Sequence, residues 1–163
     1  MTEYDIDFAR EMASVGNVIA SRSPLTNEVS SARAAIYCSL VACEIAMKAG
    51  LEAAGVPADE IRRQSHDLAK LLRYFDDCTV LENDNKRVSA SSIRSTAVHD
   101  KYPDATVGHL IESPDVSKYP NEIRYGNLLE HYPVDVVASC ATSIVEWVEK
   151  HKGTIEIRTR DTD

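Results

Sequence analysis

The sequence predicts an all-α protein, built as an up-and-down bundle of four or five helices with a long excursion before the last helix. Apolar residues recur at helical spacing through most of the chain, and Gly or Pro residues stand where the repeats stop. Between Glu82 and Tyr132 this pattern gives way to a polar segment interrupted by prolines. The length suits one domain over residues 1–163, with a core over about 5–152 and a tail over 153–163.

Two helices are expected in the N-terminal third of the chain. The first spans about residues 5–20 and ends at the polar, proline-containing segment 21–27. The second spans about residues 28–54, is rich in alanine, and is stopped by Gly55 and Pro57. Its apolar stripe keeps helical spacing over about four turns and consists of Ile36, Leu40, Cys43, Met47 and Leu51.

Two further helices are expected on either side of the polar segment. One covers about residues 59–78, and the other begins after Pro133 and ends near Lys152. Between them, residues 88–98 have a helical pattern and the rest reads as loops. Because a long irregular segment in a compact domain usually carries function, the site is expected there. The tail alternates from Thr154 like a short strand, with no partner evident in the sequence.

The charge of the chain bears on its partners. There are 26 acidic and 18 basic side chains, which give a net charge of −8. Such a surface repels nucleic acid unless its basic groups cluster. Residues 62–124 are neutral overall, so a contact with phosphate is expected in the middle third of the chain. An ordinary solvated mosaic of charges would have the same composition.

The four cysteines are Cys38, Cys43, Cys78 and Cys140. They form no C-x-x-C pair and none lies at ligand spacing from a histidine, so we predict no metal site and no cofactor. We expect reduced and mostly buried thiols. No apolar run in the sequence approaches membrane-spanning length, and the N-terminal residues are acidic. The sequence therefore predicts a cytoplasmic protein without a membrane contact.

Three segments, in this order, resemble a known family. The first is an alanine-rich helix, Ala35–Lys48, in which Glu44 and Lys48 stand four residues apart. The second is S-H-D-L-A-K-L-L, which begins at Ser65, and the third is Y-P-N-E-I-R-Y, which begins at Tyr119 ahead of the closing helix. Over roughly residues 5–150 the chain resembles the HEPN family, small helical domains of prokaryotic toxin systems that also occur beside nucleotidyltransferases.

The resemblance implies a helical bundle that is usually a homodimer. Many members of the family are metal-independent endoribonucleases, whose active site is an Arg and a His separated by four to six residues. The two copies of this motif face each other across the dimer cleft. The resemblance thus implies a ribonuclease with a toxin or defence role, paired with an antitoxin or a nucleotidyltransferase. Other members lack the motif, and they imply the alternative: a non-catalytic module that binds a nucleotide, RNA or a partner protein.

Two Arg/His pairs fit this motif. Arg124 and His131 have six residues between them and precede the last helix, although Tyr125 replaces the usual small polar residue. Arg94 and His99 have four residues between them and form the substitute pair. In such a site the histidine transfers the proton and the arginine offsets the growing charge of the phosphate.

Glu44, Tyr102 and Tyr125 are candidate binding residues. Tyrosines among basic residues can stack on nucleobases, but they can equally anchor a long loop to the core. Glu44 lies beside the apolar stripe of its helix, so it needs a partner such as Lys48 or Arg124. For His66 we expect a structural role, in which one ring nitrogen packs on the second helix.

Overall fold

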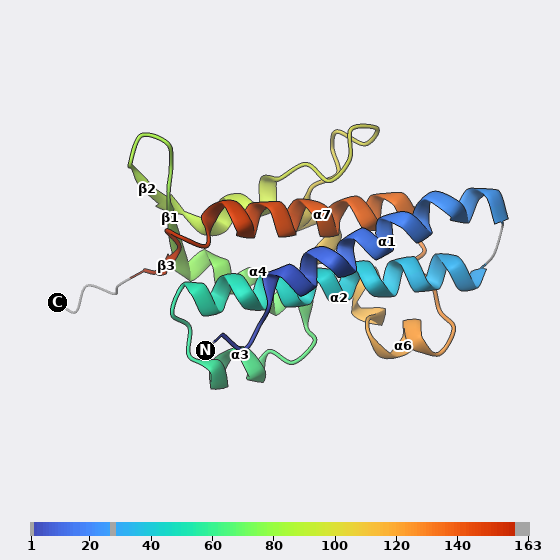
Figure 1. Ribbon diagram of the computed structural model, residues 1–163, viewed down its shortest axis with the longest axis horizontal. Coiled ribbons are helices and arrows are strands. Elements are labelled where there is room, and N and C mark those ends of the chain that lie inside the picture. The colour runs from blue at the N-terminus through green and yellow to red at the C-terminus, as the bar shows by residue number, and fades with distance from the viewer. Residues whose placement is uncertain (1, 27–28, 159–163) are drawn as a thin grey trace.

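Three long helices form the frame of the molecule (Figure 1). The computed structural model describes residues 2–26 and 29–158. The frame consists of α1 (Ile6–Thr26), α2 (Val29–Ala53) and α7 (Val134–His151), each of which contacts the other two. These are the three helices with the longest apolar repeats in the sequence, and α1 continues six residues beyond its expected end at residue 20.

The core lies on the predicted stripes. All five residues of the α2 stripe are buried, from Ile36 to Leu51, and on α7 Val137 to Val148 are buried in the same pattern. The α1–α2 contact depends on Gly16, since a Cβ atom there would lie 2.5 Å from Ser39 Oγ. Small residues thus bring α1 against α2 and leave the bulky core side chains for the α2–α7 side.

The predicted helix over 59–78 is wrong as a single element. It is divided into α3 (Ala58–Arg63), α4 (Leu68–Tyr74) and a 3₁₀ turn, η1 (Phe75–Asp77). The break has two local causes. Ser65 has a φ of 53°, outside the helical region, and the Asp67 carboxylate accepts a hydrogen bond of 3.0 Å from the Lys70 amide, which starts α4.

The protein is mostly helical, but the expectation of a purely α fold is wrong, because a small antiparallel sheet lies at one end of the bundle (Figure 1). Its order is β2-β1-β3, with β1 (Cys78–Leu81) between β2 (Arg87–Ser89) and β3 (Glu156–Ile157). The turn between β1 and β2 contains Asn85, whose φ is 59°. The strand expected in the tail is confirmed, and β1 is its partner; residues 159–163 of the tail lie outside the described residues.

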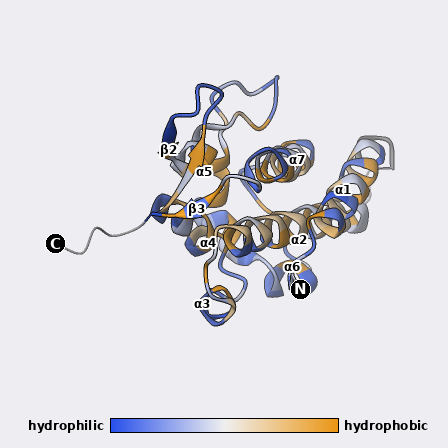
Figure 2. Ribbon diagram, turned by 60° about the vertical axis from the view of Figure 1, so that its left-hand side comes forward, coloured by the Kyte–Doolittle hydropathy of each residue, from blue (hydrophilic) through white to orange (hydrophobic). Residues whose placement is uncertain are grey.

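The rest of the excursion alternates short elements with loops, and the loops over residues 96–106 and 125–133 agree with the prediction. The short elements are η2 (Ala90–Ser95), α5 (Val107–Ile111), η3 (Pro114–Lys118) and α6 (Asn121–Arg124). The helix expected over 88–98 is thus a 3₁₀ turn that follows β2. Each element buries at least one apolar side chain, among them Ile93, Leu110, Val116 and Ile123. Figure 2 shows α3 and α6 on the side of α2 that faces away from α7.

The α2 helix occupies the middle of the bundle, which explains its composition. Among the described residues it is the one helix long and apolar enough to cross a membrane, so the expectation that no apolar run approaches this length is wrong. An 18-residue window of α2 has a mean hydropathy of 1.5, and 67% of that window is buried inside the protein. It also carries the buried charges Glu44 and Lys48. Burial between α1 and α7 accounts for its apolar residues. Of the cysteines, Cys43, Cys78 and Cys140 are buried, Cys38 is partly buried, and all four are free.

Candidate functional site

A buried carboxylate, Glu44, lies at the centre of a polar cluster on α2. Glu44 is 7% exposed. Lys48 Nζ lies 2.8 Å from Glu44 Oε1, which confirms the predicted pair one helical turn apart. His66 Nδ1 lies 2.9 Å from Oε1 and 3.1 Å from Oε2, and the hydroxyl of Tyr119 donates to Oε2. The three donors come from α2 itself, from the α3–α4 loop and from the end of η3.

The Glu44 carboxylate is ionised in this setting. Burial by itself would raise the pKa of Glu44, but the hydrogen bonds from Lys48, Tyr119 and His66 together outweigh burial and hold the pKa below its ordinary value. For Tyr119, burial and then the adjacent Glu44 carboxylate raise the pKa, so its hydroxyl keeps its proton and remains a donor. The cluster is therefore a buried anion with satisfied partners.

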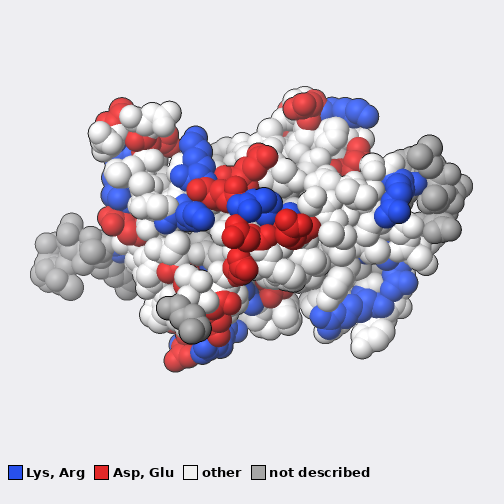
Figure 3. Space-filling model, viewed as in Figure 1, with Lys and Arg blue, Asp and Glu red and all other residues white. Residues whose placement is uncertain are grey.

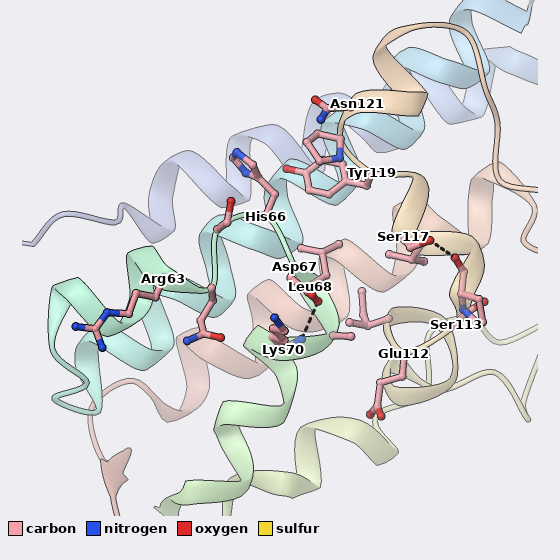
Figure 4. A pocket seen from close by; sticks show the side chains of 17 residues that line it. Arg63, His66, Asp67, Leu68, Lys70, Glu112, Ser113, Ser117, Tyr119 and Asn121 are labelled. Carbon is pink, nitrogen blue, oxygen red and sulfur yellow. Dashed lines mark hydrogen bonds between the residues drawn. The ribbon is translucent and has the colours of Figure 1, made fainter.

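His66 presents its other ring nitrogen outward. An ionised carboxylate only accepts hydrogen bonds, so Nδ1 donates to Glu44 and Nε2 is the ring nitrogen that Glu44 leaves unengaged. The imidazole side chain is 53% exposed, and its ring lies edge-on to Tyr119 with 6.4 Å between centroids. Figure 4 shows the two rings side by side at the rim of a pocket. The expected contact of His66 with the second helix through one ring nitrogen is confirmed.

The pocket beside His66 has a volume of about 600 Å³ and lies between residues 63–70 and 111–121. Arg63 and Lys70 line it, and no ion pair among the described residues involves either side chain. Its two acidic residues are already engaged: Asp67 caps α4, and Glu112 pairs with Arg94. The pocket therefore offers the uncommitted cation of Lys70 and one histidine to a ligand, whereas the Arg63 guanidinium points away from the other labelled side chains (Figure 4).

Arg124 lies on α6 and is held against α2. Its guanidinium donates two hydrogen bonds, of 3.0 and 2.7 Å, to the hydroxyl of Tyr37 and stacks over that ring at 5.3 Å. Arg33 donates to the carbonyl oxygens of Ile123 and Arg124, so a second guanidinium lies beside the first. The expected Glu44–Arg124 ion pair is wrong, because Tyr119 and Tyr37 take up these two groups instead.

This end of the protein forms a small basic and aromatic surface. The Tyr125 side chain is 88% exposed next to Arg124. Basic side chains gather where α6 lies, at the lower right of Figure 3, whereas acidic ones dominate the middle of that view. The Tyr37 ring, which holds Arg124, lies 6.1 Å from the Tyr119 ring. One chain of contacts therefore leads from Arg124 through the two tyrosines to Glu44 and His66.

His131 is exposed in the loop before α7, and its backbone is fixed. The Asp115 carboxylate accepts hydrogen bonds of 3.1 Å from the amides of Glu130 and His131, and Lys118 lies 3.1 Å from it. Burial favours a higher pKa for Asp115, but these hydrogen bonds outweigh it and lower the pKa. In the described part of the chain no hydrogen bond, ion pair or ring contact joins His131 to Arg124.

The two residues of the substitute pair, Arg94 and His99, each interact with other residues. Arg94, in η2, is engaged by Asp76 at 3.1 Å and by Glu112. His99 Nε2 lies 3.7 Å from Asp135 Oδ2, and its ring lies 5.7 Å from that of Tyr102, which is 42% exposed. The guanidinium of Arg94 is thus committed to two carboxylates, and the ring of His99 faces α7.

Sequence reasoning missed several residues of this site. Tyr37 and Tyr119 stood within the quoted segments, but nothing local to them predicts that they meet. Arg33, Arg63 and Lys70 read as ordinary surface charges of helices. A further finding concerns metals: among residues 2–26 and 29–158, no group of three or more His, Cys, Asp or Glu side chains is arranged to hold an ion.

Comparison with known proteins adds no relative to this description. The chain matches no protein-family model, no curated protein and no solved structure.

Proposed function

We propose that the protein is a HEPN-like, metal-independent endoribonuclease with a toxin or defence role. The observation that carries the proposal is the presentation of Arg124. Its guanidinium is held by Tyr37, with Arg33 and the exposed Tyr125 beside it. Guanidinium groups bind phosphates in a planar, bidentate manner, and an exposed aromatic ring stacks on unpaired bases. This is the combination that single-stranded RNA requires.

The proposed reaction uses only groups of the RNA and of the protein. The 2′-oxygen attacks the adjacent phosphorus and loses its proton to a base, while the bond from phosphorus to the 5′-oxygen breaks. The leaving oxygen takes up a proton, so the products are a 2′,3′-cyclic phosphate and a 5′-hydroxyl. Arg124 would offset the charge that grows on the phosphate. Proton transfer needs a histidine within reach of the 2′-oxygen.

The resemblance points to His131 as that histidine. Its backbone is anchored by Asp115, and its side chain is accessible to a substrate. In this form of the proposal, Arg124 and His131 of two copies line the cleft of a homodimer. The pair Arg94 and His99 has weaker support, because Arg94 is held by Asp76 and Glu112.

The proposal is tested by incubating the purified chain with a labelled single-stranded RNA in EDTA. The native chain is expected to cut, and Arg124→Ala to cut at least about 100-fold more slowly. The control is Arg73→Gln, an exposed arginine on α4 that does not line the pocket. Intact RNA with the native chain, or equal rates for native and Arg124→Ala, would contradict the proposal.

A second function, RNA or nucleotide binding without cleavage, is favoured by a different observation. Tyr125 stands where ribonucleases of the family usually have a small polar residue, and the net charge of −8 weakens the hold on a long RNA. Fluorescence anisotropy separates the two functions. A chain that binds RNA, loses binding with Arg124→Ala and never produces fragments is a binding module.

We also propose that the protein acts in the cytoplasm as a homodimer, paired with an antitoxin or a nucleotidyltransferase. The support for an interface is the outer face of α1, where Phe8, Val15 and Val18 are 48%, 43% and 55% exposed. Their spacing places them along one side of the helix, and exposed apolar stripes of this kind are typical of contact surfaces.

A further inference from the structure

We propose that His66, held by Glu44, is the proton-transferring residue of the site, and that the pocket lined by Arg63 and Lys70 binds the neighbouring phosphate of the RNA. The inference rests on the proposed ribonuclease function and gives the role of His131 to another residue. It follows from the contacts of His66, which are those of an oriented and accessible imidazole.

The His66 ring is held in one orientation by Glu44. A histidine that acts on a substrate needs one ring nitrogen fixed by an acceptor and the other free. Both carboxylate oxygens of Glu44 lie within 3.1 Å of His66 Nδ1. Glu44 cannot turn away, because Lys48 and Tyr119 hold the same carboxylate and it is buried. A surface contact that served only packing would not need so constrained an acceptor.

His66 is linked to Arg124 through two tyrosine rings. The His66 ring and the Tyr37 ring both lie against Tyr119, at centroid distances of 6.4 and 6.1 Å. Since Tyr37 holds the Arg124 guanidinium, the rings of Tyr119 and Tyr37 form the path of contacts between the histidine and the arginine. A phosphate bound by Arg124 and a ribose above Tyr119 would bring a 2′-hydroxyl toward Nε2. His131 has no such link to Arg124 among the described residues.

The charges around His66 differ between its two sides. Groups that face His66 are Glu44, Lys48 and Tyr119 on the inner side, and the pocket residues on the outer side. Of the pocket residues, Lys70 is an uncommitted cation, and Arg63 lines the pocket but directs its guanidinium away from it in Figure 4. A phosphate next to the scissile bond would be attracted to Lys70, and a volume of about 600 Å³ is large enough for one nucleotide.

The chemical step balances with one histidine. Nε2 takes the proton of the 2′-hydroxyl as the 2′-oxygen bonds to phosphorus, and Glu44 stabilises the resulting imidazolium. The imidazolium then gives that proton to the departing 5′-oxygen, and His66 returns to its neutral form. No water, metal or oxidant is consumed.

The experiment removes the outward ring nitrogen, Nε2, and keeps the hydrogen bond to Glu44. In His66→Asn the side-chain amide can still donate to Glu44, but nothing replaces Nε2. We expect the variant to unfold at the same temperature as the native chain and to cut RNA in EDTA about 10²- to 10⁴-fold more slowly. In His66→Ala the exposed position is open to solvent, so free imidazole at millimolar concentration is expected to restore part of the activity. If His66 served packing alone, free imidazole would not restore activity to His66→Ala.

Glu44 acts through His66, so Glu44→Gln is expected to lower kcat and leave KM nearly unchanged. For the phosphate subsite, Lys70→Gln is expected to raise KM several-fold, and the matched control Arg73→Gln, also on α4, is expected to leave it unchanged.

The outcomes separate the two proposals. If the native chain cuts no RNA, the ribonuclease function and this inference both fall. If the native chain cuts and His66→Asn cuts equally fast, only the inference falls. A loss of activity in His131→Ala with native activity in His66→Asn returns the proton transfer to His131.

Discussion

Removal of the Glu44 carboxylate is expected to cost more stability than any other substitution in the site. The Glu44 and Lys48 side chains are each 9% exposed, so Glu44→Ala leaves an ammonium group buried without a counter-charge. The hydroxyl of Tyr119 also loses its acceptor. Breaking one side of a buried ion pair costs about 3–5 kcal/mol, which is a large share of the stability of an ordinary domain.

Urea unfolding followed by circular dichroism measures this loss. With a loss of about 4 kcal/mol and an m-value of about 2 kcal/mol/M, the midpoint moves down by about 2 M. Tyr119→Phe, which removes one hydrogen bond to the carboxylate, is expected to cost about 1.5–3 kcal/mol. The control Glu11→Ala removes an exposed carboxylate of α1 and is expected to change stability by less than about 0.5 kcal/mol.

A double substitution checks the cause of the effect. If the unpaired Lys48 is the main cost, Glu44→Leu combined with Lys48→Met recovers much of the stability lost in Glu44→Ala, because neither buried charge remains. A loss below about 1 kcal/mol for Glu44→Ala would refute the reasoning, since a buried and fully partnered carboxylate cannot be removed at the cost of a surface charge.

Three further predictions concern other parts of the molecule. Because the pKa of Asp115 is lowered, its stabilising effect is present above its ordinary pKa of 3.8 and is lost as the pH falls through the lowered value. Asp115→Asn is therefore expected to cost about 1–3 kcal/mol at pH 7 and to weaken the fall of the melting temperature at acid pH. An unchanged fall of the melting temperature at acid pH would contradict this role. Burial, and then Lys150, lowers the pKa of His151, so the folded state resists protonation and its stability falls as the pH drops below 6.5. The melting temperatures at pH 8 and pH 5 should therefore differ less in His151→Phe than in the native chain. Equal differences in the two proteins would exclude His151 as the cause. Val15→Asp with Val18→Asp is expected to convert a homodimer to a monomer in light scattering, whereas a native dimer mass in this variant would place the interface elsewhere.

The helical frame could be predicted from the sequence because its signals are local. The α2 and α7 stripes repeat over several turns, and residues such as Gly55 and Pro133 mark their ends. The pairing of Glu44 with Lys48 and the contact of His66 with α2 followed from helical spacing and from the position of His66 at a helix start. These are short-range relations that the chain encodes directly.

The sheet and the break in the third helix could not be predicted with the same rules. β1 and β2 are short, and β1 pairs both with β2, the next strand along the chain, and with β3 from the far end of the chain. Residues 64–67 look like the middle of one amphipathic helix, although Asp67 is an N-cap residue and could have signalled a new start. The sheet therefore includes a pairing between distant segments, whereas the break in the helix has the local causes Ser65 and Asp67.

The partners of the site residues were the least predictable part. Arg124 was expected to form an ion pair with Glu44. Instead, the Tyr119 hydroxyl donates to the Glu44 carboxylate, and the Tyr119 ring lies beside Tyr37. No pattern along the sequence brings η3, α6 and the α3–α4 loop to one side of α2. Such meetings depend on how the excursion packs, which is a property of the whole fold.

The most direct test of the central claim is an analysis of the RNA ends produced by the purified chain in EDTA. The account predicts fragments with 2′,3′-cyclic phosphate and 5′-hydroxyl ends, which form at least about 100-fold more slowly when Arg124 is replaced by Ala. Fragments with other ends, fragments that form equally fast with Arg124→Ala, or RNA left whole by the native chain would contradict it.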